Sequence, residues 1–334
     1  MRTTAYGFSG RRLPLLASAA ILAAAALHPA LADAQSYPRR PVTIVVPFPP
    51  GAATDSFARA AGKRMGDLLG QQFIIDNRAG ASGRIGTDQV ARAVPDGQTL
   101  LWGSSGPLVI SPVWGEKPPY DTLRDFAPVS VFAKIPFMLV VHPSVPATTL
   151  KQLLAVVRAQ PGKLTYASSG VGGTSHLAGE LFKSMGKLSI LHVPYKGTSI
   201  FAIELIAGQV DMAFAGPTTT LPHLKTGRMR AIAITSTVRS ELVPEVPTLA
   251  EAGLPAYEFT QWYGLLAPAK TPRDIVNTLH GALLKSMEDA NVKRRVAVEG
   301  GAFAPGTSEQ FTAFLELELD KNAKTIQSAG LKRE

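Results

Sequence analysis

Two loops rich in small and hydroxyl-bearing side chains carry the residue types from which an anion-binding site can be built. The first loop runs from Phe48 to Asp55 and the second from Ser168 to His176. Each follows a short apolar run typical of a buried strand and precedes apolar residues at helical spacing. The free N–H groups and the positive dipole end of a helix N-terminus attract anions. The loops therefore predict a carboxylate site, although each alone also fits an ordinary strand–helix connection or a structural glycine turn.

The side chains of these loops, and those that follow other strands, suggest individual roles. Backbone N–H groups at residues 52–54 and 170–174 are expected to hold carboxylate oxygens, hydroxyls add donors, and two aromatic rings pack on the ligand body. Asp55 would repel an anion, so it either caps the following helix or accepts a bond from a ligand hydroxyl, amino or protonated group. The predicted ligand-binding residues are Phe48, Gly51, Ala52, Ala53, Thr54, Asp55, Ser105, Ser168, Ser169, Gly170, Gly172, Gly173, Thr174, His176, Ala215 and Trp262.

Signatures of cofactor-dependent chemistry are weak in this chain. Gly170 and Gly172 match part of a dinucleotide fingerprint, but Ser175 stands where the third glycine belongs, and no acid lies between Glu180 and Glu204 to bind a ribose. There is no Walker A loop, the histidines lack metal-ligand spacing, and there is no cysteine. We therefore predict no cofactor and no metal.

Catalytic signatures are equally sparse. The chain has no G-x-S-x-G elbow. Asp55, His176 and Asp211 are the only nearby candidates for the acid–base pair that an enzyme would need. We predict a binding protein rather than an enzyme, and an exported α/β lyase or hydrolase acting on a carboxylate remains the alternative.

The first 34 residues predict a cleaved signal peptide. Arg2, Arg11 and Arg12 form a basic segment, residues 13–27 are apolar and alanine-rich, and small-x-small cleavage sites end near Ala34. The features favour the general secretory route over a twin-arginine signal. A lipoprotein anchor needs a cysteine, which the chain lacks, so we predict an unanchored periplasmic protein.

The composition of the mature chain excludes one further class of partner. Removal of three arginines and Asp33 with the first 34 residues changes the net charge from +9 to +7. No dense basic stripe with interleaved aromatic residues appears, so no nucleic-acid partner is predicted. The modest positive charge helps to steer an anion.

The order of the expected elements predicts two α/β lobes. Strand–helix alternation runs through the first part of the chain, stops at two strands without a long helix between them (residues 126–141), and then restarts. A second crossing is expected near residues 259–267, and helices at residues 273–287 and 311–319 follow. The chain thus leaves one lobe, builds the other and returns, which places a ligand cleft between the lobes and a hinge at the crossings.

The chain also resembles the Bug family, the periplasmic solute-binding proteins of tripartite tricarboxylate transporters. The segment Pro47-Phe-Pro-Pro-Gly-Ala-Ala-Thr-Asp55 resembles the family pattern P-[FWY]-x-x-G-G-x-x-D, with Ala52 in place of the second glycine. Eight further segments resemble the family in order along the mature chain: Asn77-Arg-Ala-Gly80 with Gly83 and Gly86, Asp96-Gly-Gln-Thr-Leu100, Tyr166-Ala-Ser-Ser-Gly170, His176-Leu-Ala-Gly-Glu180, Val193-Pro-Tyr-Lys-Gly197, Gly208-Gln-Val-Asp211, Val246-Pro-Thr-Leu-Ala-Glu-Ala-Gly253 and Trp262-Tyr-Gly-Leu265.

The resemblance implies a type II periplasmic-binding-protein fold, whose two α/β lobes are joined by crossing hinge segments. We expect one lobe from residues 35–138 and 262–334 and the other from residues 139–261. It implies no catalysis, and capture of a small organic carboxylate (a di- or tricarboxylate or an aromatic carboxylate) that closure presents to the membrane permease subunits. A monomer is expected, and a ligand sensor with a signalling partner uses the same fold.

Overall fold

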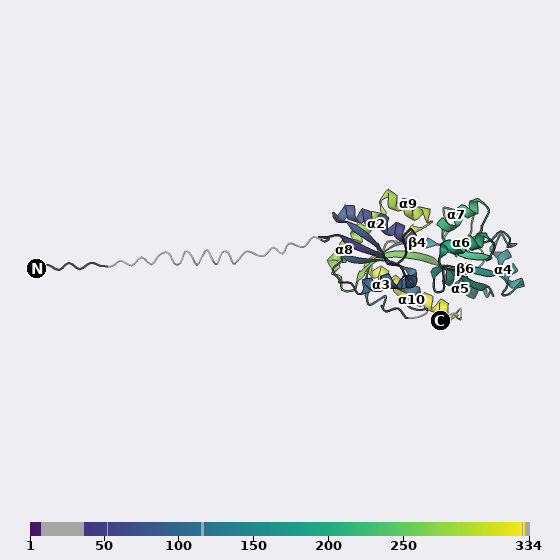
Figure 1. Ribbon diagram of the computed structural model, residues 1–334, viewed down its shortest axis with the longest axis horizontal. Helices are drawn as coiled ribbons and strands as arrows, with labels where there is room; N and C mark the ends of the chain where they lie inside the picture. Colours follow the sequence, from purple (N-terminus) through teal and green to yellow (C-terminus); the bar gives the residue numbers. More distant parts are fainter. Residues whose placement is uncertain (8–36, 52, 115–116, 329, 331–334) are drawn as a thin grey trace.

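The protein consists of two lobes that lie side by side, each built on one sheet covered by helices (Figure 1). The computed structural model describes residues 1–7, 37–51, 53–114, 117–328 and 330. Most of the predicted signal peptide, and Ala52 of the predicted site, lie outside the described residues. Within the described residues, no helix is long and apolar enough to cross a membrane.

The first sheet has six strands in the order β11-β4-β10-β3-β1-β2. β1 pairs in parallel with β2 and β3, whereas β10 pairs antiparallel with β3 and β4. The β-branched run that forms β1 is almost wholly buried, as expected of a strand covered on both faces. The strands are β1 (Val42–Val46), β2 (Phe73–Asn77), β3 (Thr99–Ser104), β4 (Phe126–Pro136), β10 (Thr260–Pro268) and β11 (Ala302–Phe303).

Helices cover both faces of this sheet (Figure 1). α2 and α8 pack against each other. Asp289 is the N-cap of α9, and its carboxylate accepts bonds from the N–H groups of Asn291 and Val292. The helical segments of this lobe are α2 (Ala53–Leu69), η1 (Ala81–Gly83), α3 (Arg84–Ala91), η2 (Gly106–Ile110), α8 (Arg273–Met287), α9 (Ala290–Val298) and α10 (Ser308–Ser328).

The second sheet repeats this arrangement with five strands in the order β7-β6-β8-β5-β9. β6 pairs in parallel with β7 and β8, and β5 pairs antiparallel with β8 and β9. Its strands are β5 (Met138–Val141), β6 (Thr165–Ser168), β7 (Leu191–Pro194), β8 (Met212–Ala215) and β9 (Arg230–Ile234). Its helices are α4 (Leu150–Ala159), α5 (Thr174–Gly186), α6 (Thr198–Ile206) and α7 (Pro217–Lys225).

The two crossing segments between the lobes are bonded to each other through Thr235, which is fully buried. Phe137 N–H donates to Thr235 Oγ1 at 2.7 Å, and Thr235 N–H donates to the Phe137 carbonyl at 2.9 Å. Phe259 N–H donates to the Thr235 carbonyl, also at 2.9 Å. One threonine therefore fixes both strands of the hinge where they pass from sheet to sheet.

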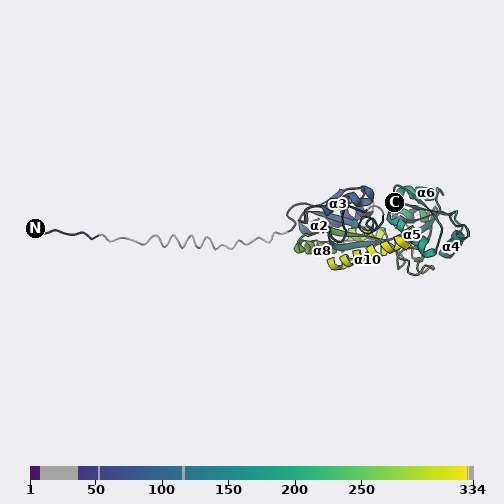
Figure 2. The ribbon, with the colours of Figure 1, turned by 90° about the horizontal axis from the view of Figure 1, so that it is seen from below.

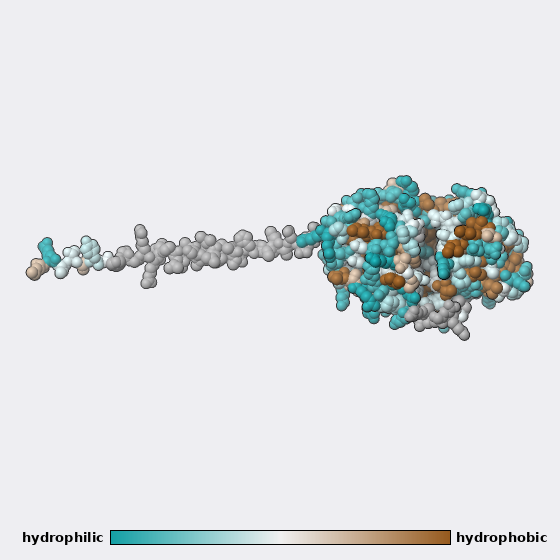
Figure 3. Space-filling model, viewed as in Figure 1, coloured by the Kyte–Doolittle hydropathy of each residue, from teal (hydrophilic) through white to brown (hydrophobic). Residues whose placement is uncertain are grey.

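The C-terminal helix α10 adds a further link between the lobes. It runs along the first lobe and ends beside α5 of the second (Figure 2), where the hydroxyls of Ser184 and Ser328 lie 3.4 Å apart. On the face shown in Figure 3, a hollow marks the boundary between the lobes.

Most predicted elements are confirmed, with shifted ends. The helix at residues 273–287 and the strand at residues 42–46 have the predicted limits. α5 begins at Thr174, inside the predicted loop, so the last residues of that loop form the first helical turn. The two-lobe α/β fold is confirmed; the division at residues 138/139 and 261/262 stays a prediction.

Candidate functional site

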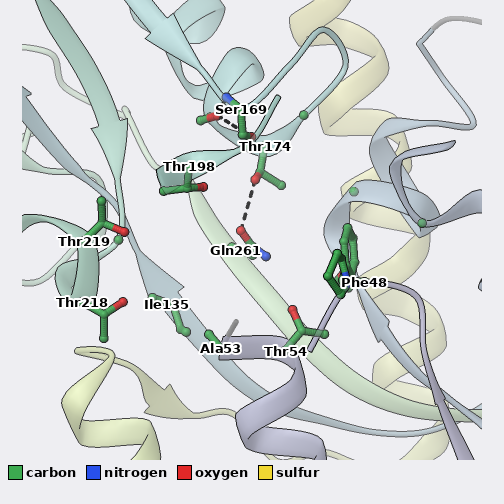
Figure 4. Close-up of a pocket in the computed structure, with 18 of the residues that line it drawn as sticks. Phe48, Ala53, Thr54, Ile135, Ser169, Thr174, Thr198, Thr218, Thr219 and Gln261 are labelled. Carbon is green, nitrogen blue, oxygen red and sulfur yellow. Dashed lines mark hydrogen bonds between the residues drawn. The ribbon is translucent and has the colours of Figure 1, made fainter. Parts of the chain in front are cut away.

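A cavity of about 1000 Å³ lies between the lobes, and residues of both predicted loops line it. Figure 4 shows Phe48, Ala53 and Thr54 of the first lobe facing Ser169 and Thr174 of the second. The volume is at the upper end for sites that hold small ligands. The carboxyl ends of β1, β3, β6 and β8 all open toward it, as in other α/β ligand sites.

The predicted residues divide into those that line the cavity and those that do not. The predicted residues in the lining are Phe48, Gly51, Ala53, Thr54, Ser169, Gly170, Gly172, Gly173, Thr174 and Ala215. Those that do not line it are Asp55, Ser105, Ser168, His176 and Trp262. Ala52 lies outside the described residues.

Four helices begin at the wall of the cavity. The cavity is lined by the first residues of α2, α5 and α6, which are Ala53, Thr174 and Thr198, and by Thr218, the second residue of α7. The N-cap positions of the three second-lobe helices are Gly173, Gly197 and Gly216, which offer no side-chain cap, and no acid lies in their first turns. Helix N-termini normally gain stability from such groups. These three ends are therefore open to an external anion.

Unpaired N–H groups remain at these helix ends. In α5 the first amide with a helical acceptor is Leu177, which donates to the Gly173 carbonyl at 3.1 Å. Within the described part of the chain, the N–H groups of Thr174 and Ser175 have no acceptor, and the same holds for Thr198 and Thr218. A ligand carboxylate can accept from them with the help of the helix dipoles.

The glycine loop before α5 differs from the prediction in its donors. The N–H groups of Gly170 and Gly172 donate to Ser168 Oγ and His176 Nδ1, each at 3.2 Å, and Gly173 N–H donates to the Gly170 carbonyl. These amides are already paired within the loop. The expected cradle of loop N–H groups is therefore corrected to the first turn of α5.

A hydrogen-bonded chain links the second lobe to the hinge strand β10 across the cavity. Thr174 Oγ1 donates to Gln261 Oε1 at 3.1 Å (Figure 4), and Gln261 Nε2 donates to the Tyr263 hydroxyl at 2.7 Å. Both Gln261 and Tyr263 line the cavity. The residues on either side of Trp262 in the sequence, rather than Trp262 itself, thus face the ligand space.

Trp262 was expected to pack on the ligand, and the structure places it in the core instead. Its side chain is fully buried, with edge-to-face contacts to the rings of Phe311 and Phe314 at 5.6 Å each. Side chains alternate between the two faces of a strand, so Gln261 and Tyr263 face the cavity and Trp262 faces α10. The alternation of side chains along this strand could be predicted from the sequence, but not which face of the strand lies toward the cavity.

Asp55 holds the first loop in place through hydrogen bonds and does not face the cavity. Its carboxylate is only 5% exposed and accepts from Gly51 N–H at 3.1 Å, Asn77 Nδ2 at 3.0 Å and Arg59 Nε at 2.9 Å. Burial alone would raise the pKa of this carboxyl, but the bonds from Arg59, Asn77 and Gly51 outweigh burial and lower the pKa. Two roles were expected for Asp55. The structure favours the one close to helix capping, because the carboxylate accepts a bond from the loop at the start of α2.

The two remaining candidates for acid–base chemistry, Asp211 and His176, do not line the cavity either. Asp211 Oδ2 accepts from the N–H and hydroxyl of Thr165, at 2.7 and 2.9 Å. His176 and Ser168 lie behind the lining, and Ser105 is buried beside it. No pair of these groups meets in the cavity, so its geometry gives no support to acid–base catalysis.

Three cations at the cavity were missed by the sequence reasoning, which expected few charged groups. Lys196 of the second lobe and Arg294 and Arg295 of α9 line the cavity, with Glu299 as the one acid in the lining. Charged side chains therefore give the lining a net charge of +2. The spacing of Val292 and Val296 is helical, but no sequence signal tells which surface α9 faces.

Glu299 links the lobes on the side of α9. Its Oε2 accepts from the Thr218 hydroxyl at 2.8 Å, which joins the end of α9 to the first turn of α7. Burial raises the pKa of the Glu299 carboxyl, and the bond from Thr218 offsets part of that rise. The contact holds the two lobes together beside the cavity.

The cavity arginines are expected to steer anions. Replacing both Arg294 and Arg295 by glutamine should slow carboxylate association by about three- to tenfold at low salt, because the local positive potential falls. The dissociation rate should change little, and the difference should vanish near 0.5 M salt, where screening is short-ranged (about 4 Å). Stopped-flow rates at several salt concentrations measure this effect.

Lys293 provides the matched control for this experiment. It is an exposed cation on the same helix that does not line the cavity. Lys293→Gln should leave the association rate within about twofold of the parent, since this exposed charge lies outside the cavity lining and is screened by salt. Equal slowing by the two variants would point to net charge rather than to the cavity lining.

A family model described as the tripartite tricarboxylate transporter family receptor (TctC) matches residues 57–331. Among curated proteins, one from the tcbD–tcbE intergenic region of Pseudomonas sp. (strain P51) is 39% identical over 318 residues, covering 95% of this chain and 94% of its own. Protein BugT of Bordetella pertussis is 35% identical over 319 residues, covering 95% and 98%.

Solved structures show the same architecture. An R. palustris protein solved with adipate is similar with a TM-score of 0.81 and 34% identity, covering 89% of this chain and 100% of its own. MatC from Rhodopseudomonas palustris, solved with bound malate, is similar with a TM-score of 0.77 and 31% identity, covering 87% and 100%.

Proposed function

Because this chain belongs to the tripartite tricarboxylate transporter receptor family, which includes the Bug proteins, we propose that it captures a small organic carboxylate between its lobes for such a transporter. It is a periplasmic solute-binding protein and not an enzyme. The observation that carries the choice of ligand is the convergence of four helix N-termini on one cavity with a positive lining. Such a cavity favours an anion and disfavours a cation.

The similar structures supply the chemistry of the first probes. Adipate and malate are both aliphatic dicarboxylates. One carboxylate of the ligand lies against the first turns of α2 and α5, where Ala53 and Thr174 line the cavity and their N–H groups have no acceptor among the described residues. The ligand body then lies against Phe48, one of the lining residues drawn in Figure 4. Further acidic or polar groups of the ligand are directed toward the first turns of α6 and α7 and the cations of the lining.

Export, assembly and partners follow from the same proposal. The signal peptide of residues 1–34 directs the chain through the general secretory route, and the mature chain works as a monomer. The lobes, residues 35–138 with 262–334 and residues 139–261, close on the carboxylate. The closed form is then recognised by the membrane permease subunits, because a ligand that contacts both lobes favours closure.

A thermal-shift screen of the mature chain tests the proposal. Succinate, malate, adipate, citrate, glutamate, nicotinate, benzoate and terephthalate form the panel, with ethanolamine and glucose as non-anionic controls. A carboxylate at a hundredfold excess over its Kd should add about 2.7 kcal/mol to the free energy of unfolding and raise Tm. Turnover of any member, or a shift with the controls only, contradicts the proposed function.

A further inference from the structure

His176 lies behind the cavity wall, in contact with both lobes. It is the third residue of α5 and is 4% exposed. One face of its imidazole packs on the ring of Trp114, at 4.4 Å between centroids, from the segment between β3 and β4 of the first sheet. The other face lies parallel to His192 of β7, at 3.7 Å and 7°. Aromatic neighbours from both lobes thus fix the ring in position.

The edge of this ring holds the glycine loop that precedes α5. Gly172 N–H donates to His176 Nδ1 at 3.2 Å, so Nδ1 must carry a lone pair and the proton is assigned to Nε2. His192 makes a parallel contact, because its Nε2 lies 2.7 Å from Ser168 Oγ, which accepts the Gly170 N–H. Two imidazoles therefore support the two amides at the middle of the loop.

The loop needs such support because of its backbone. Gly170 and Gly172 have φ angles of +130° and +76°, and no protein atom lies within 4 Å of the position of a Cβ at Gly172. Glycine at such angles loses much conformational freedom on folding, and few packing contacts hold it there. The hydrogen bond that Gly172 N–H donates to the rigid His176 ring therefore restrains the position of Gly172.

The surroundings keep His176 neutral. The titratable groups that face it are Glu180 and Lys183 of α5, His192 of β7 and Tyr166 of β6, whose hydroxyl donates to Glu180 Oε1 at 2.5 Å. Burial, with the charges of His192 and Lys183, lowers the pKa of His176 to about 3. Neutrality leaves Nδ1 free to accept the Gly172 bond at pH values well above 3.

We propose that His176 is a positioning residue, whose unprotonated Nδ1 fixes the Gly172 amide and thereby the wall of the cavity from which α5 begins. The proposal rests on the function proposed above, and it assigns to His176 no contact with the carboxylate. Loss of the Nδ1 acceptor should free the loop, and loss of the aromatic ring alone should not.

Two substitutions separate the acceptor from the ring. His176→Asn places Oδ1 close to the position of Nδ1 and retains the acceptor, whereas His176→Gln extends its amide to the position of Nε2 and loses it. Hydrogen exchange of the full mature chain without ligand reports on the loop directly. We expect amides of residues 169–175 to exchange at least tenfold faster in His176→Gln and within threefold of the parent in His176→Asn. Equal behaviour of the two variants overturns the proposal, whichever way both move.

The pH profile supplies a second readout, which tests whether Nδ1 stays unprotonated as the proposal requires. The Gly172 amide resonance in ¹⁵N-labelled protein should stay constant from pH 8 to pH 5, because the pKa of His176 is about 3. A titration of this resonance with a midpoint near 6.5 would overturn the proposal. Affinity for adipate or malate, measured in parallel, should fall about tenfold in His176→Gln alone. If no carboxylate of the thermal-shift panel binds the parent, the proposed function fails, and the exchange result still decides the role of His176.

Discussion

Replacing Ala53 by aspartate should weaken carboxylate binding about 100-fold without destabilising the fold. Ala53 is the first residue of α2 and lines the cavity (Figure 4). An aspartate at this position would lie within about 6 Å of a carboxylate bound at the same helix end. At an effective dielectric constant of about 20, two like charges at that distance repel by about 3 kcal/mol. Such a penalty corresponds to a factor of about 100 in Kd.

The same substitution should favour the helix. A carboxylate in the first turn interacts well with the helix dipole and contributes about 0.3–1 kcal/mol to stability. The variant is therefore expected to have an equal or higher Tm in the absence of ligand and a smaller Tm shift with ligand. Stability and affinity should move in opposite directions, which general damage to the fold cannot produce.

Ala53→Asn is the matched control, because it has nearly the same shape without the charge. It is expected to lose no more than about fivefold in affinity, the cost of a changed contact alone. Calorimetric titration of both variants with the strongest carboxylate of the panel measures the difference. Equal losses in the two variants would mean that bulk, and not charge at the helix end, matters there. Unchanged affinity in both would place the carboxylate away from α2.

The sequence was informative where local patterns determine structure. The apolar periodicity of α8 and the β-branched run of β1 predicted the limits of these two elements. Both patterns are clear because each element packs its apolar side chains into the core. The first crossing followed from two strands without a long helix between them, and the glycine-rich loops marked the ends of strands at the cavity. The two loops predicted a carboxylate site, and the family resemblance added the role of that site in a transporter.

Three features of the site could not be read from the sequence, because they depend on tertiary placement. The position of α9 brings Arg294 and Arg295 to the cavity. The sequence of a basic helix face does not indicate whether that face lies at a cavity or at the outer surface. The pairing of the Gly170 and Gly172 amides depends on side chains folded back onto their own loop. The orientation of Trp262 depends on which face of β10 is covered by α10.

Trp262 and Phe48 were both expected to pack on a ligand, and we now expect opposite effects of their replacement on stability and on affinity. Trp262→Ala should lower the free energy of unfolding by about 3–5 kcal/mol, because it removes a fully buried ring packed against Phe311 and Phe314. The affinity of the folded protein should stay within about threefold. Urea unfolding measures the first quantity and calorimetric titration the second. Trp262→Phe, with a smaller loss, serves if the alanine variant does not fold.

Phe48→Ala is the counterpart that tests the cavity wall. Phe48 is half-buried and lines the cavity, where its ring is seated on Gly83, at which a Cβ would lie 3.1 Å from Phe48 Cζ. Loss of the ring should cost about tenfold in affinity, since part of its apolar area is covered only when a ligand is bound. The change in unfolding free energy should be about 1 kcal/mol or less, because the ring is incompletely buried. If Trp262→Ala instead weakened binding and Phe48→Ala did not, the ligand would lie against β10 and not against the first loop.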